Sequence, residues 1–219
     1  ENNFLERVRD LASEKGIVLI FDECTSGFRQ TFGGLHKLYG VDPDMAMFGK
    51  ALGNGYAINA IIGRREVMEA AQKTFISSTF WTERIGPTAA LKTLEVMERE
   101  KSWEIITETG KEIEKKWKEL SNKYDLSINI FGLPALISFS FNYDNALALK
   151  TFLTQEMLKR GFLATTSVYV CIAHTKEILE KYFSALDEVF QKIKDCIIEN
   201  NIDKFLESPI CHSGFKRLN

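Results

Sequence analysis

The sequence predicts an α/β protein in which an α/β segment, residues 1–100, is followed by a smaller α+β domain, residues 101–219. Two observations carry this prediction. In the first hundred residues short apolar runs alternate with helical patterns, and the first run, residues 17–21, is continuous, as in a parallel strand buried on both faces. From Trp103 onwards a charged amphipathic helix and strand-like segments follow, which places the boundary near residues 98–104.

The elements of the first segment follow from hydrophobic periodicity and from glycine positions. A helix is expected over residues 4–14, because its apolar residues recur on one face, and Gly16 ends it. Strands and further helices should follow in alternation. The predicted strands are residues 17–21, 45–48 and 57–62, and the predicted helices are residues 65–71 and 86–100.

The second segment should contain three longer helices and a few strands. Asp144 is the predicted N-cap of the middle helix, which ends at Arg160–Gly161, and Thr175 begins the last helix, which runs to about residue 200. The first of these helices is predicted over residues 103–124, and the strands over residues 126–130, 135–141 and 162–173.

Composition excludes several classes of protein. Of the 219 residues, 45% are hydrophobic and 26% charged, so a sizeable core is expected. The formal net charge of -2 gives no electrostatic footprint for nucleic acid or for an anionic membrane surface, and no apolar run reaches the roughly 20 residues of a membrane span. The chain opens on a charged, helix-like segment without an initiator Met or a signal peptide, so we expect it to come from the middle of a longer protein.

The four cysteines show no pairing pattern, which favours a reduced cytoplasmic setting over a disulfide framework. Cys211–His212 could form half of a metal site, but no second pair with zinc-like spacing accompanies it, so no metal is expected.

Two short motifs carry the chemistry. Asp22 stands at the C-terminal end of the first apolar strand, which is where open α/β sheets bind ligands, although a strand-end salt bridge or helix cap is the simpler interpretation of this residue alone. Lys50 follows Gly49 between two strands, where the unencumbered backbone could approach a planar cofactor, and a solvated loop lysine is again the simpler interpretation. The sequence around Lys50 does not match a phosphate-binding P-loop, because that motif needs Gly at the position of Asp44 and Ser or Thr at the position of Ala51.

Taken together, the two motifs resemble class III pyridoxal-phosphate (PLP) aminotransferases. The similarity runs through residues 17–68 in order, and the glutamate-1-semialdehyde aminomutase branch is the most similar one; only the C-terminal half of such an enzyme is represented. The motifs that carry it are Asp22-Glu23, Gly27-Phe28-Arg29, Gly33-Gly34, Tyr39-Gly40-Val41, Pro43-Asp44, Gly49-Lys50 and Gly63-Arg64. The resemblance implies the type I fold of PLP-dependent transferases, with part of the PLP-binding large domain in residues 1–100 and the small C-terminal domain in residues 101–219.

The resemblance also implies roles for individual residues. Lys50 would form the Schiff base with PLP and shuttle the proton, and Asp22 would bond the pyridine nitrogen and keep it protonated. Cys24, two residues after Asp22 and therefore on the same face of the strand, would pack on the ring where the family usually has Val; a redox or nucleophilic role is the alternative. Thr79 matches a loop that contacts the PLP phosphate of a neighbouring subunit, unless it belongs to an ordinary turn. In the same loop, Glu83-Arg84 replaces the common Asn-Pro.

The function implied is that of a cytoplasmic, homodimeric aminotransferase or aminomutase acting on a small amino or oxo substrate. A PLP-dependent decarboxylase or racemase on the same scaffold is one alternative, and a non-catalytic binding or assembly module is another. The N-terminal half of such an enzyme normally supplies the phosphate loop and the ring-stacking residue. We therefore expect this chain to be a fragment, or to work with another chain, and to be inactive alone.

Overall fold

The structure is a computed structural model that describes residues 3–77 and 79–214. The chain divides into two compact units, one up to residue 105 and the other from residue 106 onwards. Among the described residues, no helix combines the length and the apolar character needed to cross a membrane.

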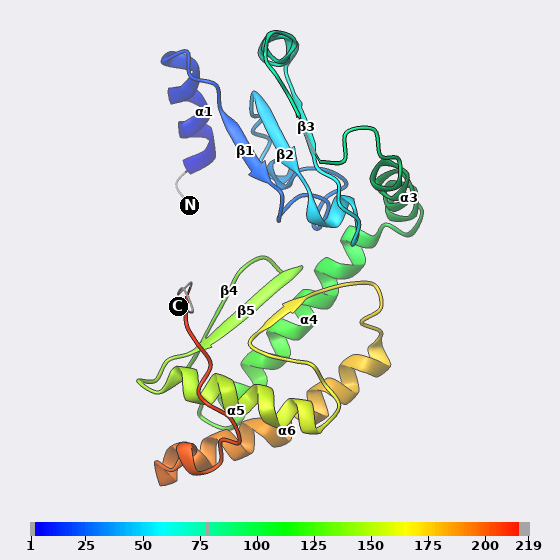
Figure 1. The fold of residues 1–219 in the computed structure, drawn as a ribbon. Coiled ribbons are helices and arrows are strands. Elements are labelled where there is room, and N and C mark those ends of the chain that lie inside the picture. The colour runs from blue at the N-terminus through cyan, green and yellow to red at the C-terminus, as the bar shows by residue number, and fades with distance from the viewer. Residues whose placement is uncertain (1–2, 78, 215–219) are drawn as a thin grey trace. The chain divides into compact units, whose positions relative to one another are not determined.

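The first unit is built on a three-stranded sheet with the order β1-β2-β3. Strand β1 (Ile20–Glu23) pairs in parallel with β2 (Met45–Phe48), and β2 pairs antiparallel with β3 (Ala60–Gly63). Figure 1 shows β1 and β2 side by side and pointing in the same direction. The helices of this unit are α1 (Phe4–Glu14), α2 (Arg65–Met68) and α3 (Ile85–Glu100), with 3-10 turns at Leu35–Leu38, Lys50–Leu52 and Glu69–Lys73.

The core of the first unit is small and lies on one face of this sheet. Ala46 and Phe48 of β2 are buried there with Leu52 and with Ala90 of α3. Four partly buried residues pack around them: Phe28, Ile58, Ala60 and Leu94.

The predicted first strand begins three residues too early. Ile17 donates its backbone N–H to the carbonyl of Ala12 at 2.8 Å, which closes the end of α1, and Leu19 donates to the Asp44 carboxylate at 2.8 Å. Asp44 also holds the guanidinium of Arg9 at 2.8 Å. Because these contacts occupy the backbone before Ile20, the ladder with β2 starts only there.

The prediction that this strand is buried on both faces is wrong for the structure. Ile17, Val18 and Ile20 are 58%, 47% and 48% exposed. The core described above covers one face of the sheet only, and the apolar character of the run therefore reflects a face that nothing in this unit covers.

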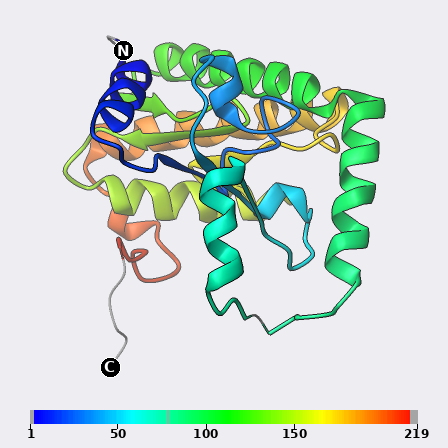
Figure 2. The same ribbon diagram turned by 90° about the horizontal axis from the view of Figure 1, so that it is seen from above.

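The second unit packs three helices against an antiparallel sheet with the order β4-β5-β6. In Figure 1 helices α5 and α6 run alongside each other next to the strands, and in Figure 2, seen from above, the strands overlie α6. The helices are α4 (Ser102–Lys123), α5 (Ala146–Lys159) and α6 (Lys176–Glu199), and the strands are β4 (Ile128–Phe131), β5 (Leu136–Phe141) and β6 (Ser167–Tyr169). A 3-10 turn, Ile202–Lys204, follows α6.

The core of this unit is aromatic and dense. Alternate residues of β5 face the helices, and the ring of Phe139 contacts both Trp117 of α4 and Phe190 of α6, at 4.7 and 6.1 Å between ring centroids. The Trp117 indole N–H donates to the hydroxyl of Tyr182 at 3.0 Å, so this fully buried donor is paired. Phe190 itself is fully buried in this core.

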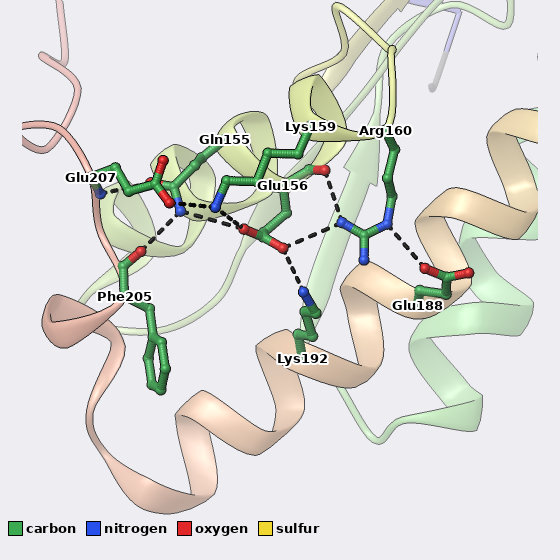
Figure 3. Close-up of polar contacts among 8 residues, drawn as sticks. All are labelled: Gln155, Glu156, Lys159, Arg160, Glu188, Lys192, Phe205 and Glu207. Carbon is green, nitrogen blue, oxygen red and sulfur yellow. Dashed lines mark hydrogen bonds and ion pairs between the residues drawn. The ribbon is translucent and has the colours of Figure 1, made fainter.

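A buried carboxylate of α5 binds a lysine of α6, and neighbouring side chains of α5 bind the segment that follows α6 (Figure 3). Glu156 is 4% exposed and accepts hydrogen bonds from Lys159 at 2.8 Å and from Lys192 at 2.7 Å, with Arg160 at 3.3 Å. The neighbouring Gln155 donates to the carbonyl of Phe205 and accepts from the N–H of Glu207. The residues after α6 are therefore fastened along α5.

Two predicted boundaries of the second unit are wrong. The N-cap of α5 is Asn145 rather than Asp144, because a turn closed by the hydrogen bond from Ala146 to Tyr143 sets the entry to the helix one residue later. Strand β6 covers three residues, against twelve predicted, because the apolar Phe162 and Ala164 pack on the core from irregular backbone. Thr175, by contrast, is the N-cap of α6 as predicted, and its hydroxyl accepts from the N–H of Ile178 at 3.4 Å.

Candidate active site

Asp22 and Lys50 lie at the same end of the first sheet, where β1 and β2 finish. Strands β1 and β2 are parallel, and the register pairs Glu23 with Phe48, so both strands end at the same level. Asp22 is the third of the four residues of β1, and Lys50 follows β2 after a single residue, Gly49. The carboxyl ends of neighbouring parallel strands are the place where α/β sheets bind ligands.

Asp22 is held in its ionised form. Its Oδ1 accepts the backbone N–H of Cys24 at 3.0 Å. This hydrogen bond is the largest cause of a lowered pKa of Asp22, and a second hydrogen bond, from the Cys24 thiol, lowers the pKa further. Burial raises the pKa by less, and the positive charge of Lys50 lowers it slightly. The carboxylate is therefore a fixed anion at neutral pH and is suited to accept a hydrogen bond from a cationic group.

Cys24 reaches Asp22 through a turn rather than along the strand. Strand β1 ends at Glu23, so the strand alternation expected to carry Cys24 to the Asp22 side does not apply at this position. The hydrogen bond to Asp22 raises the pKa of the Cys24 thiol, and the nearby negative charge adds to that shift. A thiol with a raised pKa stays protonated at neutral pH, which favours a packing role over a nucleophilic one.

Lys50 begins a 3-10 turn with a backbone φ of +43°, in the left-handed region that residues with a side chain seldom adopt. Gly49 before it is buried, and a Cβ at this position would lie 2.5 Å from Oδ1 of Asn59 and 3.7 Å from Sγ of Cys24. A larger residue would force Asn59 to move. The glycine therefore lets the chain turn closely beside Cys24 and present Lys50 at the sheet edge.

The Nζ of Lys50 donates a hydrogen bond to the hydroxyl of Thr25. Thr25 was not predicted as a site residue. It lies three residues after Asp22 in the turn that follows β1, and no periodic or spacing signal marks it. Its carbonyl oxygen also accepts from Nε of Arg29 at 2.8 Å, which fixes the turn from the other side.

Glu23 anchors the loop behind the site. It is 4% exposed, and its carboxylate accepts from the Ser26 hydroxyl, from the N–H of Leu35 and from the N–H of His36, at 2.5, 2.9 and 2.9 Å. Burial alone would raise the pKa of Glu23, but these hydrogen bonds outweigh it and lower the pKa. These contacts give Glu23 a structural role behind the site.

Thr79 lies in a turn before α3, and its side chain is exposed. Ser78, beside it in the predicted phosphate loop, lies outside the described residues. Glu83, which replaces the asparagine common in the family, caps α3: its carboxylate accepts from the N–H groups of Ile85 and Gly86, the latter at 3.0 Å. A phosphate contact of Thr79 stays a prediction.

Asp22 shares a sheet face with apolar residues that are open to solvent. We call this set the Asp22 face; the strand register places Ile20, Met45, Met47 and Ile61 on it with Asp22. Ile20 and Ile61 are 48% and 50% exposed, and Asp22 is itself exposed. An anion in an uncovered apolar surface is the arrangement expected of a site that is completed by something placed over it.

The described residues contain no group of three or more His, Cys, Asp or Glu side chains arranged to hold a metal ion. Cys211, half of the only metal pair that the sequence suggested, instead donates its backbone N–H to Thr151 at 2.9 Å and is a free thiol. Cys24, Cys171 and Cys196 are also free.

Comparison with known proteins identifies the family of the chain. Residues 1–197 match the family model described as Aminotransferase class-III. The chain is 35% identical over 197 residues to a 3-aminobutyryl-CoA aminotransferase of Cloacimonas acidaminovorans, covering 87% of this chain and 48% of that protein. It is 29% identical over 213 residues to a glutamate-1-semialdehyde 2,1-aminomutase of Methanocaldococcus jannaschii, covering 89% and 49%.

Solved structures with a similar fold are also PLP-dependent transaminases. A structure of the FumI protein of Sphingopyxis sp. MTA144, in its PLP internal aldimine form, superposes with a TM-score of 0.84 at 22% identity and covers 90% of this chain and 48% of that one. The chain thus spans about half the length of the relatives it matches, and the predicted fold class, part of the PLP-dependent transferase fold, is confirmed. With the family model matched over 197 of 219 residues, the chain belongs to the class-III aminotransferase family.

Proposed function

We propose that this chain carries the lysine and the ring-nitrogen partner of a pyridoxal-phosphate site, in an aminotransferase or aminomutase that acts on a small amino or oxo substrate. The observation that carries the proposal is that Asp22 and Lys50 both lie at the carboxyl ends of two neighbouring parallel strands. Family membership and the PLP-bound fold relatives support it. Because the relatives are about twice as long, we propose that the working enzyme contains further chain beyond these residues.

The residues present fit pyridoxal phosphate. The cofactor has an aldehyde, which needs a primary amine, and a pyridine nitrogen, which a carboxylate keeps protonated. Lys50 offers the amine and Asp22 the carboxylate, and the charge of Lys50 acts on Asp22. The Cys24 N–H holds the carboxylate in place, and Gly49 lets the chain pass closely beside Cys24 to bring Lys50 to the strand ends.

Each side chain then has a defined task. Asp22, ionised and oriented by Cys24, accepts the hydrogen bond of the ring N–H and keeps the proton on that nitrogen. Lys50 would hold the cofactor through its Nζ and would take and return a proton at that atom. Bound pyridoxal phosphate supplies the electron-withdrawing ring that stabilises negative charge on the substrate carbon.

The assignment of Lys50 is tested by chemical trapping. The protein is incubated with pyridoxal phosphate, reduced with sodium borohydride and digested, and the modified peptide is located by mass spectrometry. We expect Lys50 to be the modified lysine and Lys50→Ala to lose the modification. Lys37→Ala is the matched control, because Lys37 is an exposed lysine of the same unit. Trapping on another lysine, with Lys50 unmodified, contradicts the proposal.

The role of Asp22 is tested by Asp22→Asn, which keeps the size of the side chain and removes its charge. Loss of the anion opposite the ring nitrogen should lower turnover by several orders of magnitude, on the scale of removing other key electrostatic groups. Asp22→Glu should be impaired as well, because the longer side chain misplaces the carboxylate. An Asp22→Asn enzyme within tenfold of wild type would refute the role.

The reaction class is tested separately. A non-catalytic module has no need for a carboxylate and an amine at the ends of neighbouring strands, so the geometry favours an enzyme. An aminotransferase passes the amino group to an added oxo acid, and an aminomutase moves it within one substrate. A decarboxylase releases carbon dioxide and a racemase inverts the substrate, so neither transfers the amino group. Product analysis by mass spectrometry with a labelled amino nitrogen separates these outcomes.

A further inference from the structure

We propose that Thr25 is the residue that positions the amine of Lys50 at the strand ends, a role that rests on the proposed function of Lys50. The hydroxyl of Thr25 accepts a hydrogen bond from Nζ of Lys50, across the end of the sheet. Thr25 follows Asp22 by three residues, and the backbone N–H of Cys24, between them, donates to the Asp22 carboxylate, so the amine is held at the same strand ends as the carboxylate that would face the cofactor.

The turn that carries Thr25 is fixed on both sides. Before it, Glu23 is buried and accepts hydrogen bonds from Ser26, Leu35 and His36, and its carbonyl accepts the N–H of Gly27 at 2.8 Å. At Thr25 itself, Arg29 donates to the carbonyl oxygen at 2.8 Å. The backbone under the hydroxyl is therefore constrained, and the hydroxyl offers a fixed point for a mobile partner.

Lys50 is such a partner. A lysine side chain has four rotatable carbon bonds and loses considerable rotamer freedom when its amine is placed. The left-handed backbone of Lys50 directs the start of the side chain, and the hydrogen bond to Thr25 fixes its end. A pre-placed amine needs a shorter search for a cofactor seated beside Asp22. The hydrogen bond to Thr25 must also break before the exposed amine can react with a reagent in solvent.

These two consequences give opposite signs in two assays. The first uses the protein without cofactor: lysines are acetylated with limiting acetic anhydride, and the modification of each lysine is quantified by mass spectrometry. The second adds pyridoxal phosphate and measures the rate at which borohydride-fixable cofactor accumulates on Lys50. The variants are Thr25→Val, which keeps the β-branched shape without the hydroxyl, and Thr25→Ser, which keeps the hydroxyl.

We expect Thr25→Val to raise acetylation of Lys50 and to slow capture of the cofactor, each by roughly three- to tenfold, the effect of one ordinary hydrogen bond. Thr25→Ser should stay within about twofold of wild type in both assays, the residual effect allowed for a retained hydrogen bond. Lys37 is the internal control, and its acetylation should not change in either variant. A loosened fold would raise the acetylation of Lys37 as well.

Acetylation of Lys50 that is equal in wild type and Thr25→Val overturns the proposal, and so does a Thr25→Ser variant that behaves like Thr25→Val. A rise in Lys37 and Lys50 together also overturns it, because the effect is then one of folding. If wild type captures no cofactor on Lys50, the proposed function fails, while the acetylation comparison still decides whether Thr25 places the amine.

Discussion

Replacing Glu156 by Gln should destabilise the second unit by an amount that depends on pH. The side chain is buried, and the charges around it come from two helices: Lys159 and Arg160 on α5, and Lys192 on α6. Burial alone would raise the pKa of Glu156, but the hydrogen bonds from Lys159 and Lys192 outweigh it and lower the pKa to about 2, against an ordinary value of 4.5.

The size of the effect follows from linkage between protonation and folding. A carboxylate with a lowered pKa in the folded state stabilises that state fully above its ordinary pKa, and the contribution is lost as the pH falls through the folded-state value. With a folded value of about 2 and an ordinary value of 4.5, the contribution is about 3 kcal/mol at pH 7 and roughly 1 kcal/mol at pH 3. Because glutamine carries no charge at any pH, the Glu156→Gln variant should lose this pH-dependent term.

Denaturant unfolding followed by tryptophan fluorescence measures this difference. Trp117 is fully buried in the core of the second unit, and replacing Trp81 and Trp103 by Phe leaves it as the reporter. The free energy of unfolding is compared between Glu156 and Glu156→Gln proteins from pH 7 down to pH 3. Glu188→Gln is the matched control, because Glu188 pairs with Arg160 at 3.1 Å yet stays 65% exposed, and exposed pairs contribute at most about 1 kcal/mol.

The reasoning is refuted if the Glu156→Gln penalty is the same at pH 7 and pH 3, because the loss is then one of packing. It is also refuted if Glu188→Gln costs as much as Glu156→Gln, since burial would then have no influence on the strength of these ion pairs.

Three further outcomes are expected. Gly110→Ala should destabilise the protein by more than about 2 kcal/mol in thermal unfolding, despite the higher helix propensity of Ala, because the new Cβ would lie 1.9 Å from the carbonyl oxygen of Pro134. Tyr182→Phe should cost about 1–3 kcal/mol in the same assay, because the buried indole N–H of Trp117 loses the hydroxyl that accepts its hydrogen bond; a smaller loss would show that another group accepts it. Thr79→Ala should weaken cofactor binding by roughly ten- to a hundredfold, and in the wild-type protein pyridoxal phosphate should stabilise the dimer in sedimentation; a variant with unchanged affinity would show an ordinary turn.

The sequence predicted most of the helices and fewer of the strand limits. Helix α1 begins and ends where the apolar spacing placed it, and the Thr175 cap located the start of α6, because both signals are local. The first strand was displaced because Asp44, distant in sequence, takes the N–H of Leu19. The hydrophobic pattern of residues 17–21 gives no sign of a hydrogen-bond partner that lies so far away in the sequence.

The site shows the same division between local and non-local information. Asp22 and Lys50 were found from motifs, and the parallel pairing of their strands brings them together. Thr25 was missed, because its value lies in where a turn points its hydroxyl, and a turn of this kind carries no spacing rule. The capping role of Glu83 was also missed, although an acidic residue just before a helix is a recognisable N-terminal signal.

The exposure of the Asp22 face bears on how the chain can act. Asp22 and Lys50 are exposed in the structure, and two unit charges in water-like surroundings interact several times more weakly than in a protein interior. The apolar residues beside Asp22 are half exposed, so the same face would gain free energy from being covered. Covering it would exclude water and strengthen every interaction of the Asp22 carboxylate at once. The physical chemistry of the site therefore favours a catalyst that is completed over this face, in agreement with a chain that spans about half the length of its relatives.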